Sequence, residues 1–102
     1  MCGAPAQEEE LDRTLPATVD PATATVIQGS VWHDGAPVAG AYVRLLDGTD
    51  EFTAEVVTSP EGEFRFFAAP GRWTVRALGP GASGEQAVVA RTGFTELQLE
   101  LA

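Results

Sequence analysis

The sulfur of Cys2 is the most reactive atom that the sequence offers. Cys2 is the single cysteine among 102 residues, and the small residue Gly3 follows it. Because position 2 is small, we expect the initiator methionine to be removed, which places an amine and a thiol on adjacent carbons. The α-ammonium favours the thiolate, a nucleophile and soft-metal ligand. Cys2 is therefore the candidate sulfur-carrying residue, and the alternative is an incidental thiol at a chain end.

Hydrolytic chemistry would depend on His33, the single histidine of the chain. A triad needs this base beside a serine nucleophile and an orienting acid. The candidate nucleophiles are Ser30, Ser59 and Ser83, and none of them lies in a nucleophile-elbow pattern. His33 precedes Asp34 and Gly35, so a solvated turn is the alternative interpretation. We therefore predict no catalytic residues and no enzyme activity.

Metal chemistry also lacks a complete set of ligands. Cys2 and His33 provide two ligands where a zinc site needs three or four. Asp47, Asp50 and Glu51 offer carboxylate oxygens to calcium, but their spacing does not match the EF-hand loop. The sequence therefore predicts neither a metal site nor a cofactor.

Two aromatic residues with polar groups are the candidates for binding a partner. Trp32 lies opposite Ile27 and Val31 in the alternation of its predicted strand, and Tyr42 lies in the next predicted strand. Such side chains anchor proteins or sugars when they are exposed. The alternative for Trp32 is packing in the core.

The charge balance excludes whole classes of partner. The chain has 15 acidic residues, six basic residues and a net charge of −9. All six basic residues are arginine. Nucleic acid binding depends on clustered Lys and Arg, so we expect no nucleic acid partner. No segment is long and apolar enough to span a membrane, and no signal sequence precedes Cys2, so we predict a cytoplasmic protein.

The elements that position these residues divide the chain into two parts. Residues 1–23 are polar and acidic, and they contain several prolines. We predict a flexible acidic N-terminal arm there, whose second half lies along the surface of the domain because Pro16 and Pro21 favour extended geometry. The alternative for the first half is a short acidic helix over residues 8–13. An arm of this length has a reach on the order of 25 Å, enough to bring Cys2 into a partner's active site.

Residues 24–102 are predicted to form one all-β domain with seven short strands. The strands are expected at residues 25–32, 41–47, 52–58, 63–67, 72–78, 85–91 and 94–101, and residues 79–84 are expected to form a flexible loop. The clearest pattern lies between Thr58 and Ala77, where two turns containing proline and glycine separate alternating strands. The predicted core side chains there are Phe64, Phe66, Trp73, Val75 and Ala77.

Several segments resemble the carboxypeptidase regulatory-domain and Cna protein B-type superfamily. They are residues 26–31, 35–45, 62–66 and 70–75. This resemblance implies a transthyretin-like Greek-key β-sandwich. The whole chain, including residues 1–3 and 50–57, resembles a smaller actinobacterial family of SseC-like proteins, whose genes lie beside rhodanese-type thiosulfate sulfurtransferases. That likeness implies a link to sulfur metabolism by association.

The enzymes and crosslinks of related sandwiches need residues that this chain lacks. A Cna-type isopeptide bond requires lysine, which is absent. Transthyretin-like hydrolases use a cluster of His and Arg, and intradiol dioxygenases bind iron with two Tyr and two His, whereas Tyr42 and His33 are the single residues of their kinds here. We therefore expect a binding or scaffold module that acts with a sulfurtransferase-type partner. The alternatives are a persulfide carrier that uses Cys2 and a carbohydrate-binding sandwich.

Overall fold

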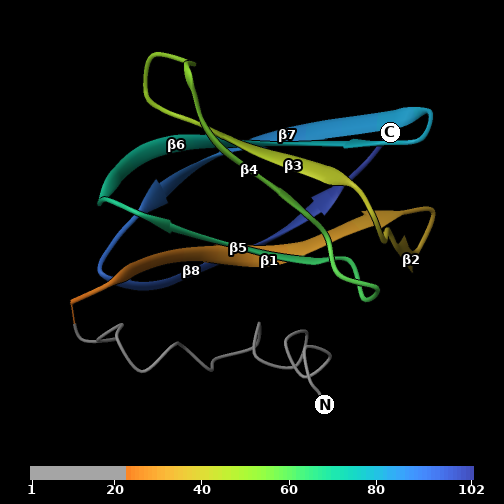
Figure 1. The fold of residues 1–102 in the computed structure, drawn as a ribbon, viewed down its shortest axis with the longest axis horizontal. Coiled ribbons are helices and arrows are strands. Elements are labelled where there is room, and N and C mark those ends of the chain that lie inside the picture. Colours follow the sequence, from red (N-terminus) through yellow and green to blue (C-terminus); the bar gives the residue numbers. More distant parts are fainter. Residues whose placement is uncertain (1–22) are drawn as a thin grey trace.

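A computed structural model of the protein describes residues 23–102, which form eight β-strands in two sheets (Figure 1). The strands are β1 (Thr25–His33), β2 (Ala36–Pro37), β3 (Tyr42–Leu46), β4 (Phe52–Val57), β5 (Glu63–Ala68), β6 (Gly71–Gly79), β7 (Ala82–Ala90) and β8 (Gly93–Glu100). The predicted arm lies outside the described residues except for Thr23. No helix within residues 23–102 could cross a membrane.

Sheet A contains β1, β2, β5 and β8, with β1 at its centre. The strand β5 pairs antiparallel with the first part of β1, and the short β2 continues along the same edge at Trp32 and His33. On the other edge β8 runs parallel to β1 from Thr25↔Gly93 to Trp32↔Glu100. The first and last strands of the domain are therefore neighbours in one sheet.

Sheet B contains the other four strands in the order β4-β3-β6-β7, with every pair antiparallel. It lies against sheet A, and Figure 1 shows β3, β6 and β7 in the upper half of the view and β1, β5 and β8 in the lower half. The two layers confirm the predicted transthyretin-like all-β sandwich.

The core lies between the sheets and consists of the inward members of the alternating strands. These are mainly Ile27, Val31, Val43, Leu45, Phe64, Phe66, Val75, Ala77, Val88, Leu97 and Leu99. Phe64 and Phe66 are buried, and their ring centroids lie 6.0 Å apart. Trp73 is half-buried against this cluster, and its Nε1–H donates to the carbonyl oxygen of Ala69 at 2.9 Å. The predicted core of residues 64–77 is therefore confirmed.

Two expectations about the strands need correction. The structure has eight strands where the sequence predicted seven, because the Asp34-Gly35 turn folds Ala36 and Pro37 back onto the end of β1. Both turn residues have positive φ, as a type I′ hairpin turn requires.

The predicted loop at residues 79–84 is a tight turn of two residues. Gly79 and Ala82 are already paired across β6 and β7, which leaves Pro80 and Gly81 to reverse the chain. Proline fixes φ at the first turn position, and Gly81 takes a φ of 72° at the second. The small side chains of residues 79–84 therefore lie mostly at strand ends. The prediction that they mark a flexible loop was wrong.

The last residues of the chain connect the two sheets at one end. Leu101 is buried in the core, and its N–H donates to the Trp32 carbonyl oxygen at 2.7 Å. Ala102 exchanges two backbone hydrogen bonds with Ser83 on β7, of 3.1 and 3.4 Å. Sheet A is therefore joined to sheet B by hydrogen bonds at this position.

Candidate functional site

Trp32 and Tyr42, the two described residues that were singled out for binding, do not form one site. Cys2 lies outside the described residues. Trp32 is on β1 of sheet A and Tyr42 is on β3 of sheet B. Their neighbours Val31 and Val43 both point into the core, so Trp32 and Tyr42 point away from it in opposite directions. A partner that binds the outer face of sheet B at Tyr42 therefore does not contact the surface around Trp32.

Tyr42 lies in an exposed apolar row on the outer face of sheet B. It is paired with Val57 of β4 on one side and with Leu78 of β6 on the other. Tyr42 is 53% exposed and Val57 is 57% exposed, while Leu78 is half-buried. We call these three residues the Tyr42 patch. It combines apolar area with a phenolic hydroxyl, which can donate or accept a hydrogen bond.

A charged row borders the Tyr42 patch two residues along each strand. The residues, in order across β4, β3, β6 and β7, are Glu55, Arg44, Arg76 and Glu85. The Arg44 Nε donates to Glu55 Oε2 at 2.7 Å, and the Arg76 Nε donates to Glu85 Oε1 at 2.9 Å. The two arginines face each other across β3 and β6, and each is paired with a glutamate of the strand beyond. The two ion pairs therefore hold these four charged side chains beside the Tyr42 patch.

Trp32 is half-buried on the outer face of sheet A. Its Nε1–H donates to the Ser30 Oγ at 2.7 Å, two residues earlier on the same face of β1. Because that bond uses the single donor of the indole, Trp32 offers a partner mainly the apolar surface of its ring.

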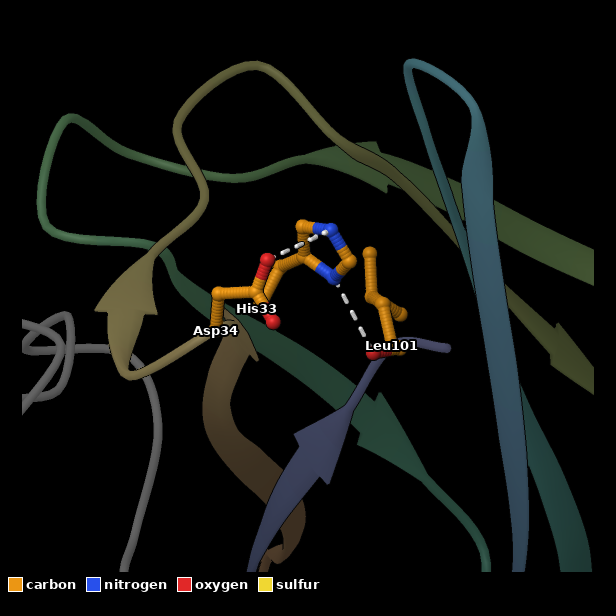
Figure 2. A network of polar contacts seen from close by, with 3 residues as sticks. All are labelled: His33, Asp34 and Leu101. Carbon is orange, nitrogen blue, oxygen red and sulfur yellow. Dashed lines mark hydrogen bonds and ion pairs between the residues drawn. The ribbon is translucent and has the colours of Figure 1, made fainter.

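His33 lies at the end of β1, beside the last residues of the chain (Figure 2). Its Nδ1 is 3.1 Å from the Leu101 carbonyl oxygen, which can only accept, so Nδ1 carries the donated proton. Its Nε2 is 3.5 Å from Asp34 Oδ2, and that contact is an ion pair only when the ring is protonated. The geometry links β1 to Leu101, and it directs Nδ1 to a backbone carbonyl rather than to a nucleophile.

Two of the candidate serine nucleophiles have local partners. The Ser30 Oγ accepts from Trp32, and the Ser59 Oγ accepts from the backbone N–H groups of Glu61 and Glu63 at 3.3 and 3.1 Å. The bonds of Ser59 shape the turn before β5. These hydroxyls therefore have structural roles in a strand and in a turn.

The acidic turn after β3 is organised around Asp47. Its Oδ1 accepts from the Thr49 hydroxyl at 2.7 Å, from the Thr49 N–H at 2.8 Å and from the Glu51 N–H at 3.0 Å. The Thr49 hydroxyl, followed by the two backbone donors, lowers the pKa of Asp47 below its ordinary value. No group of three or more His, Cys, Asp or Glu residues within 23–102 is arranged to hold a metal ion.

The sequence singled out Tyr42 but missed the two apolar residues beside it. Val57 and Leu78 belong to strands whose alternate residues are in the core, so the period of two places both on the outer face. The alternation of apolar and polar residues does not show which strands lie beside β3. The turn at residues 47–50 would have supplied one neighbour, because it sets the pairing of β3 with β4.

Several solved structures resemble the sandwich, including two whose alignments cover most of both chains. The crystal structure of S.CueP aligns with a TM-score of 0.64 at 12% identity, covering 92% of this chain and 85% of that one. The 5-hydroxyisourate hydrolase of Klebsiella pneumoniae aligns with a TM-score of 0.55 at 21% identity, covering 74% and 87% of the two chains. At these identities the likeness shows the fold alone.

Sequence similarity covers nearly the whole chain. The uncharacterized protein Rv0814c of Mycobacterium tuberculosis is 56% identical over 94 residues, which are 91% of this chain and 89% of the relative. A family model described as "Protein of unknown function (DUF1416)" matches residues 2–101. This chain therefore belongs to the DUF1416 family.

Proposed function

We propose that this protein is a non-catalytic, cytoplasmic binding module that associates with a rhodanese-type thiosulfate sulfurtransferase through the Tyr42 patch. The exposure of Tyr42 and Val57 side by side on a regular sheet is the observation that supports this proposal. The choice of partner comes from the resemblance to SseC-like proteins, whose genes accompany such enzymes.

The Tyr42 patch has the composition of a protein-binding surface. Buried aromatic anchors supply much of the energy of protein association, and tyrosine is among the residues most enriched there. Interfaces also have polar rims, and the row from Glu55 to Glu85 provides one beside the patch. The patch lies on paired strands, so no backbone segment has to become ordered on binding.

The test compares two substitutions on the same face of sheet B. Tyr42→Ala removes the aromatic ring of the patch. Val89→Ala is the matched control, because Val89 of β7 is also 57% exposed but lies opposite Arg72, away from the patch. Binding to the purified sulfurtransferase of the source organism is measured by titration calorimetry. We expect Tyr42→Ala to weaken binding by about tenfold or more and Val89→Ala to leave it unchanged.

Three results would contradict the proposal, and the first two concern single proteins. One is a wild-type protein that does not bind the enzyme even at concentrations well above the dissociation constants of transient complexes. The other is a Tyr42→Ala variant that binds as tightly as the wild type. Equal losses in both variants would also contradict it, since the contact would then not be centred on Tyr42.

The persulfide carrier is the second candidate, because the sequence places one thiol at residue 2. In this reaction thiosulfate gives its outer sulfur to the enzyme thiol and leaves as sulfite. The Cys2 thiolate then attacks that persulfide, takes the outer sulfur and releases the enzyme thiolate. Intact mass after incubation would show one added sulfur in the wild type and none in Cys2→Ser. No added sulfur on the wild type would exclude the carrier and leave the binding module intact.

Carbohydrate binding is the third candidate, and it depends on Trp32. The indole N–H is donated to Ser30, so Trp32 offers a sugar the face of its ring and no free hydrogen-bond donor. Quenching of the Trp32 fluorescence by added glycans would support this candidate, and unchanged fluorescence would contradict it.

A further inference from the structure

The outer face of sheet A has a buried centre that the sandwich core does not explain. Val26 and Gln28 alternate with the core residue Ile27, so they point away from sheet B. Val26 is nevertheless 1% exposed and Gln28 is 4% exposed. Neither residue belongs to the cluster between the sheets. Something other than sheet B must therefore exclude water from them.

The strands on either side of β1 shield the flanks of the Val26 and Gln28 side chains. Val26 is flanked by Phe67 of β5 and Phe94 of β8, and we call these three residues the Val26 row. Gln28 donates from Nε2 to Glu96 Oε2 at 3.1 Å and accepts at Oε1 from the Arg65 Nε at 3.0 Å. Side chains on adjacent strands stand beside each other, and they do not cover each other's outward ends.

The strand β1 itself provides an internal comparison for this face. Ser30 points to the same side as Val26, between the longer side chains of Glu63 on β5 and Gln98 on β8, and it is half-buried. A small residue between two larger ones therefore keeps part of its surface open to water further along β1. The contrast with Val26, at 1%, indicates a covering layer over the start of β1.

The covered area is small and lies at the start of β1. Within the Val26 row, Phe67 is 52% exposed and Phe94 is half-buried, so the cover reaches β1 and β8 rather than the β5 edge. Further along β1, Ser30 and Trp32 are again half-buried. The cover therefore lies where the chain enters the domain after Thr23.

We propose that residues 15–19 of this chain form that cover, with Leu15, Ala17 and Val19 facing the Val26 row. These three apolar residues alternate with Pro16 and Thr18, which gives an extended segment one apolar face. Asp20-Pro21 is a turn-forming pair that can reverse the chain before Thr23. Four to eight extended residues reach up to roughly 13–26 Å, which is enough to return over Val26 and Gln28.

The proposal is independent of the sulfurtransferase. It assigns the outer face of sheet A to the chain's own segment and leaves the Tyr42 patch, on the other sheet, for a partner. A second copy of the chain or another protein could cover the same row, and the test must distinguish these occupants.

The test uses the full-length protein in solution. Nuclear Overhauser contacts are recorded from the Val26 methyl groups in a uniformly labelled sample and in a mixture of labelled and unlabelled chains. We expect contacts from Val26 to Leu15 or Val19 within one molecule. Contacts that appear only between molecules would assign the face to a second copy and overturn the proposal. Contacts restricted to β5 and β8 would overturn it as well.

A pair of arm variants gives a second readout. Leu15→Ser with Val19→Ser removes the apolar face of the segment, whereas Leu11→Ser is a matched change outside it. We expect the double variant to lose the contacts to Val26 and to bind more of the dye ANS, which reports exposed apolar surface. Leu11→Ser should do neither. Unchanged dye binding in the double variant, or an equal rise in both proteins, would overturn the proposal.

Discussion

Thr58 shows how one polar side chain holds a connection in the sandwich. It is buried, its Oγ1 accepts from the Ala41 N–H at 2.8 Å, and it donates to the Val38 carbonyl oxygen at 2.7 Å. These two bonds fix the segment that leads from β2 into β3. Buried polar groups usually stabilise a fold only when they are fully bonded, and the hydroxyl of Thr58 uses both its donor and an acceptor.

We expect Thr58→Val to lower the free energy of unfolding by about 1–3 kcal/mol. The valine keeps the shape of the side chain but leaves the buried Ala41 N–H without this acceptor. Thr53→Val, on the exposed side of β4, is the control and should change stability by less than about 0.5 kcal/mol. Urea denaturation of both variants measures the difference. A Thr58→Val protein as stable as the wild type would contradict this role.

Asp47 makes the stability of the β3–β4 turn depend on pH. Its pKa in the folded protein is lowered from 3.8 by hydrogen bonds from Thr49 and Glu51. A carboxyl with a lowered folded pKa contributes stability above its unfolded pKa and loses that contribution as pH falls through the folded value. We therefore expect Asp47→Asn to be less stable than the wild type at pH 7. Thermal unfolding from pH 7 to pH 2 should show the difference shrinking below about pH 4, and a constant difference would contradict this explanation.

At the scale of elements, the strands were largely predictable and their neighbours were not. Alternation and turn residues placed seven strands close to their observed bounds, because each strand has one buried face. The pair Ala36–Pro37 was missed as a strand, since two residues show no period. The order of strands depends on contacts between distant parts of the chain. The sequence therefore gave no sign that β8 lies parallel to β1 or that Trp32 and Tyr42 face opposite sides.

The hairpin between β6 and β7 depends on the positive φ of Gly81. Nothing lies within 4 Å of the position that a Cβ would occupy there, so Gly81→Ala tests the backbone conformation alone. We expect it to cost about 1–2 kcal/mol. Gly48→Ala is the control, because Gly48 has no positive φ and the nearest atom would be 3.8 Å away. Chemical denaturation of the two variants should separate them, and equal stability would show that the turn tolerates a side chain.

At the scale of the whole molecule, the two outer faces of the sandwich differ in character. The centre of sheet B is open around the Tyr42 patch, whereas the start of β1 on sheet A is shielded from water. The sequence identified Tyr42 but not this asymmetry, because alternation assigns a residue to a face without saying what lies above it. The net charge of −9 opposes binding to phosphate groups at either face.

Leu101 tests how much the junction of the two sheets contributes to the whole fold. Its side chain is buried in the core, and its backbone bonds to β1. We expect Leu101→Ala to lower the free energy of unfolding by about 2–5 kcal/mol. Glu100→Ala, one residue earlier and exposed, should have little effect. Calorimetric unfolding compares the two variants, and similar melting temperatures would show that the Leu101 side chain contributes little, because the alanine variant keeps the backbone bonds of the junction.

The bonds between Ala102 and Ser83 also bear on how molecules of this protein behave when crowded together. Ser83 directs both its N–H and its carbonyl oxygen toward Ala102. The backbone groups at this position of the edge strand β7 are therefore already hydrogen-bonded. Unoccupied sheet margins are where chains polymerise into fibrils. Ala102 therefore blocks this part of the β7 edge, so that a strand from another molecule cannot pair with the start of β7.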